Sequence, residues 1–206
     1  MSRPWKRSLL GIAIASLLCA LPASAQPSAA VQKVEQFNAT LLTIMKNAEK
    51  LKFTGRYKTL EPVLLDSFDM GFMARFSAGR HWRALPDPDR KRLVNAFSKL
   101  WISTYADRFD GYGGEQIEII GTEKAPRDTL MVKTKIVKSG GEKVSIDYLL
   151  RQKAGVWSVI DIFLKGRFSE LAKQRAEYTS ILRRSGISGV VATVDETVRR
   201  MQSRSR

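Results

Sequence analysis

The spacing of apolar residues changes twice along the chain, and this change constrains the fold more than any other feature. Within residues 31 to about 109, apolar residues recur three or four positions apart from Val34 to Leu51 and again from Leu93 to Phe109. This spacing predicts amphipathic helices. From about residue 115 the period becomes two in "EQIEIIG", "TLMVKTKIVK", "KVSIDYLL" and "GVWSVIDIFL", which predicts four strands. Helical spacing returns in residues 168–186 and 187–202. This order, without an internal repeat, predicts an α+β domain in which helices pack on one face of a four-stranded antiparallel sheet.

Asp161 lies in the middle of the last expected strand, both faces of which are largely apolar, so its carboxylate needs partners. An even-length turn after Arg151 would pair Leu150 with Trp157, Tyr148 with Val159 and Ile146 with Asp161. One face of the sheet then carries Ile146, Tyr148, Leu150, Trp157, Val159 and Phe163. The opposite face, which we expect to be exposed to solvent, carries Ser145, Asp147, Arg151 and Ser158. We therefore expect Asp161 to point inward, either as a hydrogen-bonded structural carboxylate or as a general base whose pKa burial has raised.

The first 25 residues have the pattern of a cleaved secretory signal peptide. Arg3, Lys6 and Arg7 precede an apolar run from Leu9 to Leu21, and "ASA" ends at Ala25. The run is shorter than the roughly 20 residues that span a bilayer. We expect cleavage after Ala25, a single domain over residues 26–201 and a solvated basic tail over residues 202–206.

Charge and cysteine content narrow the classes of partner. The single cysteine, Cys19, lies in the expected signal peptide, so the mature chain can form no disulfide. Removing the three cations of that peptide lowers the formal net charge from +15 to +12. For an exported protein, anionic membrane surfaces and acidic proteins are more plausible complements of this charge than nucleic acid.

The residues that usually carry out catalysis are scarce. His81 is the only histidine, and the sequence has no nucleophile elbow, glycine-rich phosphate loop or His/Cys metal spacing. We expect neither an enzyme nor a cofactor. The aromatic residues leave two alternatives open, because a filled core and a cavity for an acyl chain have the same periodicity.

Two blocks of the sequence resemble the MlaC, or toluene-tolerance, family. The first carries Arg75, Gly79, Trp82, Phe97, Tyr105 and a "Y-x-G" at residues 112–114; the second carries Tyr148, Trp157, Asp161, Gly166, Ser169 and Arg175. "LKFTGRYKTLEPVLLDSFDMGFMARFSAG" and "RFDGYGGE" are most similar to the HpnM branch, which is associated with hopanoid biosynthesis. Two details depart from the usual pattern: "GRFS" is one residue longer than G-[IV]-S, and Tyr178 replaces a Phe.

The resemblance implies a periplasmic carrier with a cystatin-like or nuclear-transport-factor-like cone that encloses lipid. Such a carrier moves phospholipid, or here a hopanoid, between an inner-membrane transporter complex and an outer-membrane lipoprotein, and makes only transient contact with membranes. Asp161 is then expected to pair with Arg175 or Arg167. The expected lipid-contacting residues are Phe76, Trp82, Phe97, Trp101, Tyr105, Val132, Ile146, Tyr148, Trp157, Val159 and Phe163. A cavity-free basic adaptor that tethers transporter components or an anionic membrane remains the alternative.

Overall fold

A computed structural model describes residues 28–204, so the expected signal peptide lies outside the described residues. The helices are α1 (Ala29–Lys46), α2 (Ala48–Ser67), α3 (Met70–Ala78), the 3-10 helix η1 (Gly79–Ala84), α4 (Asp87–Arg108) and α5 (Glu170–Arg204). The strands are β1 (Gln116–Ala125), β2 (Thr129–Val137), β3 (Lys143–Lys153), β4 (Val156–Leu164) and β5 (Phe168–Ser169). None of the helices in this described part is both long and apolar enough to cross a membrane.

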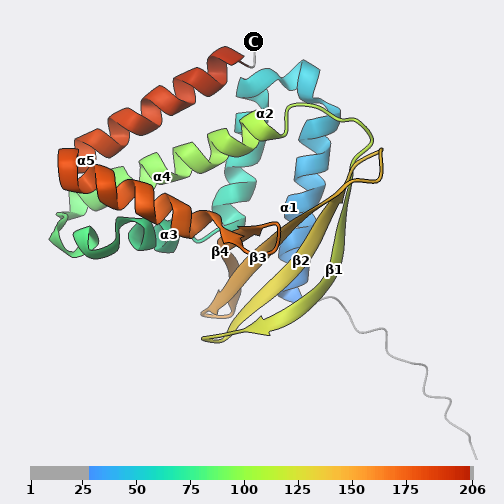
Figure 1. The fold of residues 1–206 in the computed structure, drawn as a ribbon, viewed down its shortest axis with the longest axis horizontal. Coiled ribbons are helices and arrows are strands. Elements are labelled where there is room, and N and C mark those ends of the chain that lie inside the picture. The colour runs from blue at the N-terminus through green and yellow to red at the C-terminus, as the bar shows by residue number, and fades with distance from the viewer. Residues whose placement is uncertain (1–27, 205–206) are drawn as a thin grey trace, which may run out of the picture.

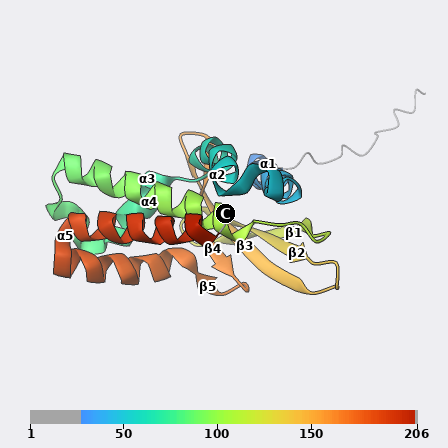
Figure 2. The same cartoon turned by 90° about the horizontal axis from the view of Figure 1, so that it is seen from above.

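The five described strands form one antiparallel sheet in the order β1-β2-β3-β4-β5. The α+β class is confirmed, but the expectation of four strands was wrong, because the two residues of β5 fold back and pair with the end of β4. Helix α1 lies across the sheet, while α3, α4 and α5 form a separate group beside it (Figure 1). Seen from above, α1 and α2 lie on one side of the sheet (Figure 2). Both α3 and α5 contact β4.

Helix α5 consists of two arms that meet at Gly186. This residue has φ 61°, outside the helical region, and the second arm runs back beside the first (Figure 1). The break falls between the two helical segments expected from the sequence. The second arm continues to Arg204, which pairs with Asp107, so the helix includes part of the expected tail.

The expected register of the last hairpin was wrong in two respects. The turn is two residues long, Ala154 and Gly155, both with positive φ, so Leu150 pairs with Val159 rather than Trp157. This shift of two positions leaves Tyr148, Leu150 and Val159 on the same, core-facing side. A bulge at Ile160 then reverses the alternation further along β4.

The bulge moves two residues away from the face that we expected them to share with Tyr148. Ile162 pairs with Tyr148 on the core side, whereas Phe163 pairs with Asp147 and Asp161 with Leu149 on the other side. That other side is not exposed to solvent near these residues, because Asp147 and Asp161 are both buried. The expectation that Asp147 faces water was therefore wrong, and its carboxylate accepts a hydrogen bond from the Thr134 backbone N–H at 3.3 Å.

Candidate functional site

A cavity of about 420 Å³ lies between α4, the two arms of α5 and strands β3 and β4. Its size falls within the range of roughly 300–1,000 Å³ typical of small-molecule sites. Helix α4 contributes its second half, and the fold-back at Gly186 brings the second arm of α5 over the same space. The apolar and aromatic lining residues are Leu100, Trp101, Tyr105, Phe109, Ile146, Ile162, Leu164, Tyr178, Val194 and Met201.

The walls of this cavity are apolar because three elements turn their hydrophobic faces toward it. Trp101, Tyr105 and Phe109 recur every four residues along α4, and the rings of Tyr105 and Phe109 stack with centroids 5.6 Å apart. Opposite them, Ile146 and Leu164 form a cross-strand pair between β3 and β4. An apolar chain placed here would contact hydrocarbon and aromatic surface on both sides.

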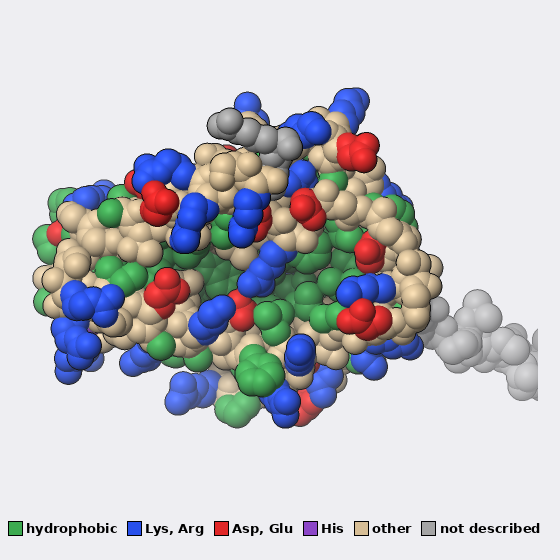
Figure 3. Space-filling view, turned by 45° about the horizontal axis from the view of Figure 1, so that its top comes forward, with side chains coloured by type: hydrophobic (Ala, Val, Ile, Leu, Met, Phe, Trp, Pro, Cys, Tyr) green, Lys and Arg blue, Asp and Glu red, His purple; other side chains and the backbone are tan. Residues whose placement is uncertain are grey.

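Charged side chains surround the mouth of the cavity. Arg108 on α4 pairs with Glu170 at 3.8 Å, and Asp107 pairs with Arg204 at 2.9 Å, so both pairs link α4 to an arm of α5. Lys173 also lines the cavity. The side of the molecule that carries the C-terminal end of α5 shows a hollow with hydrophobic side chains in its floor and both basic and acidic side chains around it (Figure 3).

Tyr178 supplies a buried polar group in this apolar setting. Its side chain is 1% exposed, it lines the cavity, and its hydroxyl has no hydrogen-bond partner among the described residues. Burial raises the pKa of Tyr178, so the group is a neutral hydroxyl at physiological pH. A buried hydroxyl without a partner is costly unless something pairs with it, so it is available to hydrogen-bond a ligand.

The residues expected to contact lipid do not all lie together. Trp101, Tyr105 and Ile146 line the cavity. Phe76 and Trp82 line a different groove on the molecule. The rest of the set is elsewhere: Phe97, Val132, Tyr148 and Val159 are fully buried in the core, Trp157 is partly buried against it, and Phe163 lies on the other side of the sheet.

Several cavity residues were not expected from the sequence. Ile162 and Leu164 were missed because alternation along β4 breaks at the bulge, which periodicity does not reveal. Val194 and Met201 belong to the apolar stripe of the second arm of α5, but only the fold-back brings them to the cavity. The one sequence signal for this fold-back was Gly186, because glycine is the usual residue where a helix breaks with positive φ.

Asp161 joins β4 to the start of α5 and does not line the cavity. Its carboxylate accepts hydrogen bonds from the Ile162 N–H at 2.7 Å, the Leu171 N–H at 3.1 Å and the Ser169 hydroxyl at 2.6 Å. The Ser169 hydroxyl in turn accepts from the Ala172 N–H at 2.8 Å, so the two side chains together cap the helix. Burial raises the pKa of Asp161 above its usual value, although its three hydrogen bonds oppose that shift.

The expected pairing of Asp161 with Arg175 or Arg167 was wrong. The Arg175 guanidinium lies 4.8 Å from the centre of the Phe76 ring, and the Arg167 guanidinium lies over Phe168. The backbone N–H groups of Ile162 in β4 and Leu171 in the first turn of α5, together with the Ser169 hydroxyl, satisfy the carboxylate instead. His81 lies in η1 and lines neither the cavity nor the groove. Residues 28–204 contain no His, Cys, Asp and Glu cluster that could hold a metal ion.

Comparison with known proteins identifies relatives of this fold. A solved structure of a phospholipid-binding protein from Ralstonia solanacearum, in complex with a phospholipid, matches with a TM-score of 0.72 and 19% sequence identity. The match covers 84% of this chain and 98% of that one, and at this identity it establishes the fold. No curated protein matches the chain. The family model for the MlaC protein matches residues 35–196, which is most of the chain. The chain therefore belongs to the MlaC family.

Proposed function

We propose that this protein is a non-enzymatic periplasmic lipid carrier that holds acyl chains in the cavity between α4, α5 and the sheet. The observation that carries the proposal is the apolar cavity itself, with aromatic and aliphatic walls and a charged mouth. Membership of the MlaC family and the phospholipid bound by the Ralstonia solanacearum protein support the same class of ligand.

The chemistry of the cavity suits an amphiphile. Each CH₂ group removed from water contributes about 0.8 kcal/mol, so covering an acyl chain during transit through an aqueous space is strongly favourable. Two of the three cations at the mouth, Arg108 and Arg204, pair with carboxylates of the protein, whereas Lys173 makes no ion pair among residues 28–204 and is placed to attract an anionic headgroup. The Tyr178 hydroxyl would hydrogen-bond an ester or hydroxyl oxygen of the cargo.

The carrier would move its cargo between an inner-membrane transporter complex and an outer-membrane lipoprotein partner. We place the protein in the hopanoid-associated HpnM branch, on the similarity of residues 51–79 and 108–115 to that branch. The cargo is then a phospholipid or a hopanoid. Export through a signal peptide cleaved after Ala25 would put the mature domain in the compartment where such transfer is needed.

Lipid extraction from gently purified protein, followed by mass spectrometry, tests this function. We expect about one lipid per protein molecule, since one cavity can hold one amphiphile. Protein that is folded yet carries no lipid, and that takes up none from vesicles, would support the cavity-free adaptor instead. The identity of the extracted lipid separates phospholipid from hopanoid.

A pair of threonine variants locates the cargo. Thr104 lines the cavity and donates a hydrogen bond to the Leu100 carbonyl at 2.8 Å; Thr43 is exposed on α1 and makes the same bond to the Ala39 carbonyl at 2.9 Å. Thr104→Trp puts an indole ring into the cavity and should abolish the bound lipid while the protein stays folded. Thr43→Trp loses the same hydrogen bond and should retain the lipid. Full lipid occupancy in Thr104→Trp would place the cargo elsewhere.

A further inference from the structure

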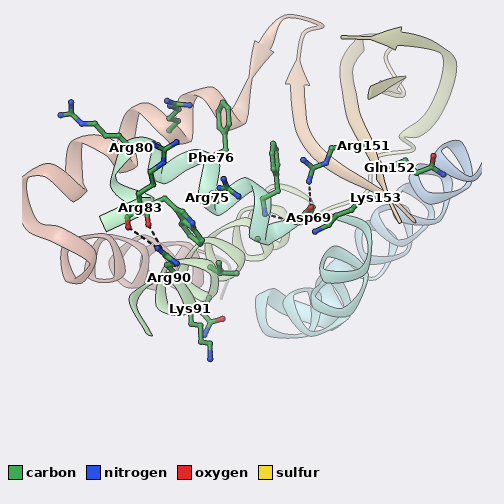
Figure 4. Close-up of a pocket in the computed structure, with 17 residues that line it drawn as sticks. Asp69, Arg75, Phe76, Arg80, Arg83, Arg90, Lys91, Arg151, Gln152 and Lys153 are labelled. Atoms are coloured by element: carbon green, nitrogen blue, oxygen red, sulfur yellow. Dashed lines mark hydrogen bonds and ion pairs between the residues drawn. The ribbon is translucent and has the colours of Figure 1, made fainter. Parts of the chain in front are cut away.

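A second concave surface, separate from the cavity, lies between α3, η1 and the start of α4 on one side and β3 and α5 on the other. This groove has a volume of about 1480 Å³ and shares no lining residue with the cavity. It is open to solvent, and side chains from these elements line it (Figure 4).

The groove is strongly basic. Its cationic lining residues are Arg75, Arg80, Arg83, Arg90, Lys91, Arg151, Lys153 and Arg175, and its single acidic one is Asp69. That carboxylate is already engaged, because it pairs with Arg151 at 3.0 Å and accepts a hydrogen bond from the Phe72 N–H at 2.9 Å. Like charges gathered in one concave surface repel one another and focus the field on an anion.

Most of these cations lack an anionic partner within the protein. Arg90 pairs with Asp87 at 3.0 Å, and Arg151 pairs with Asp69. The other six make no ion pair with any residue in the described range 28–204. Carboxylates elsewhere on the surface do form such pairs, for example Asp195 with Lys99. The groove therefore retains a large uncompensated positive charge.

Three of the guanidinium groups are held in place on aromatic rings. Arg151 lies 4.2 Å from the centre of the Phe72 ring, Arg175 lies 4.8 Å from that of Phe76, and Arg90 lies 5.6 Å from that of Trp82. Stacking on a ring fixes the plane of a guanidinium. Arg175 makes no ion pair with the described residues, so its N–H edge can donate to a ligand. Arg151 already donates to Asp69, and Arg90 donates to Asp87 and to two backbone carbonyls of η1. Arginines positioned in this way lose little entropy when they bind carboxylates, and they bind them in bidentate geometry.

The cations are spread along the groove rather than gathered at one point. Arg80, Arg83, Arg90 and Lys91 lie toward one end, Arg151 and Lys153 toward the other, and Arg75 lies between them (Figure 4). We propose that this groove is the docking site for an extended acidic segment of a partner protein. Several carboxylates along such a segment would meet the successive cations, and its aliphatic parts would contact Phe72 and Phe76.

This arrangement favours a peptide over two other anions. A membrane surface is flat, whereas these cations line a concave surface, into which a flexible segment can follow the successive cations. A single phosphate group would engage the cations at one end and leave those at the other end unpaired. The proposal does not depend on lipid binding, because the groove and the cavity have no residue in common.

Fluorescence anisotropy with a fluorescein-labelled oligoglutamate peptide tests the proposal on the full mature chain. Arg80→Glu/Arg83→Glu reverses two exposed groove cations that make no ion pair among residues 28–204. The control, Lys50→Glu/Lys58→Glu, makes the same change in net charge at exposed positions on α2, outside the groove. Phosphatidylglycerol vesicles and inorganic phosphate serve as the alternative probes.

We expect the wild type and the control to bind the peptide with dissociation constants within about twofold of each other, and the groove variant to bind about tenfold more weakly or worse. Added salt should weaken the wild-type binding. Lipid content and the circular dichroism spectrum of the groove variant should match those of the wild type, which separates this test from that of lipid carriage.

Four results would overturn the proposal. The first two are the absence of peptide binding by the wild type and an equal weakening of peptide binding in the two double variants. The other two are displacement of the peptide by inorganic phosphate at equal ionic strength, and a groove variant that loses vesicle binding while its peptide binding is unchanged. The last result would make the groove a membrane-contacting surface.

Discussion

Replacement of Asp161 by alanine tests whether this carboxylate holds the sheet to α5. In the wild type it accepts hydrogen bonds from the Ile162 N–H, the Leu171 N–H and the Ser169 hydroxyl. The Ser169 hydroxyl oxygen in turn accepts a hydrogen bond from the Ala172 N–H. The alanine variant removes the acceptor while leaving the donors in place. It therefore measures the cost of leaving those donors without a partner.

The expected cost follows from how buried each donor is. Leu171 is 3% exposed, so water cannot easily reach its N–H, and an unpaired buried donor costs about 1–3 kcal/mol. Ser169 is partly exposed and can turn its hydroxyl toward water. Removing a carboxylate whose pKa is raised by burial offsets part of the loss, because the ionised form is itself disfavoured there. We expect a net loss of about 1–3 kcal/mol in the free energy of unfolding.

Urea unfolding followed by circular dichroism at neutral pH measures this loss. Asp161→Asn retains an oxygen acceptor of the same shape and should lose less than the alanine variant. Asp110→Ala removes an exposed carboxylate from the end of α4 and should change stability by no more than about 0.5 kcal/mol. The reasoning is refuted if Asp161→Ala and Asp110→Ala are equally mild, or if the asparagine variant is as unstable as the alanine one.

Four more measurements test other parts of the structure. Burial raises the folded pKa of Asp161 above 3.8, so the part of the unfolding free energy that depends on protonation of this carboxyl is complete below that pH and is lost as pH rises through the folded pKa. Asp161→Asn, which does not titrate, should therefore gain on the wild type in unfolding experiments as pH rises. Val159 is 1% exposed and lies outside the cavity, so Val159→Trp should overpack the core and lower the unfolding free energy by about 1–3 kcal/mol. Arg56 donates to the buried Ala106 carbonyl at 2.7 Å, and Arg56→Met should cost about 1.5–3 kcal/mol in the same assay. Intact-mass measurement of exported protein should find Gln26 at the N-terminus; retention of residues 1–25 would contradict cleavage after Ala25.

The elements that periodicity could predict are those whose spacing stays regular. The change from a helical period to a period of two placed the four long strands and the boundary of the helical regions, and Gly186 marked the break in α5. What periodicity could not predict is a local departure from it. A bulge adds one residue to one strand without any sequence mark, and here it places Asp161 and Phe163 on the side opposite to the one expected.

Asp147 shows why a polar residue does not identify a solvent-facing side. Its position in a strand with alternating polarity indicated exposure, yet Asp147 is only 8% exposed and its carboxylate accepts a hydrogen bond from the Thr134 backbone N–H. The turn between β4 and β5 covers this side, since a side chain added at Gly166 would lie 3.6 Å from the Asp147 carboxylate. A two-residue strand such as β5 is too short to give a periodic signal, so its covering effect was not predictable.

Phe97 and Trp101 show why the cavity could not be separated from the core on the sequence alone. They lie one turn apart on α4, their rings stack with centroids 5.5 Å apart, and both belong to the same apolar stripe. Phe97 is fully buried against Tyr178, whereas Trp101 lines the cavity. The two turns of α4 have different neighbours: Phe97 packs against Tyr178 of the first arm of α5, whereas the cavity beside Trp101 is also lined by Val194 and Met201 of the second arm, which the break at Gly186 folds back. Periodicity reports which side of a helix is apolar, but whether side chains or a ligand fill the space beside it depends on how far away the next element lies.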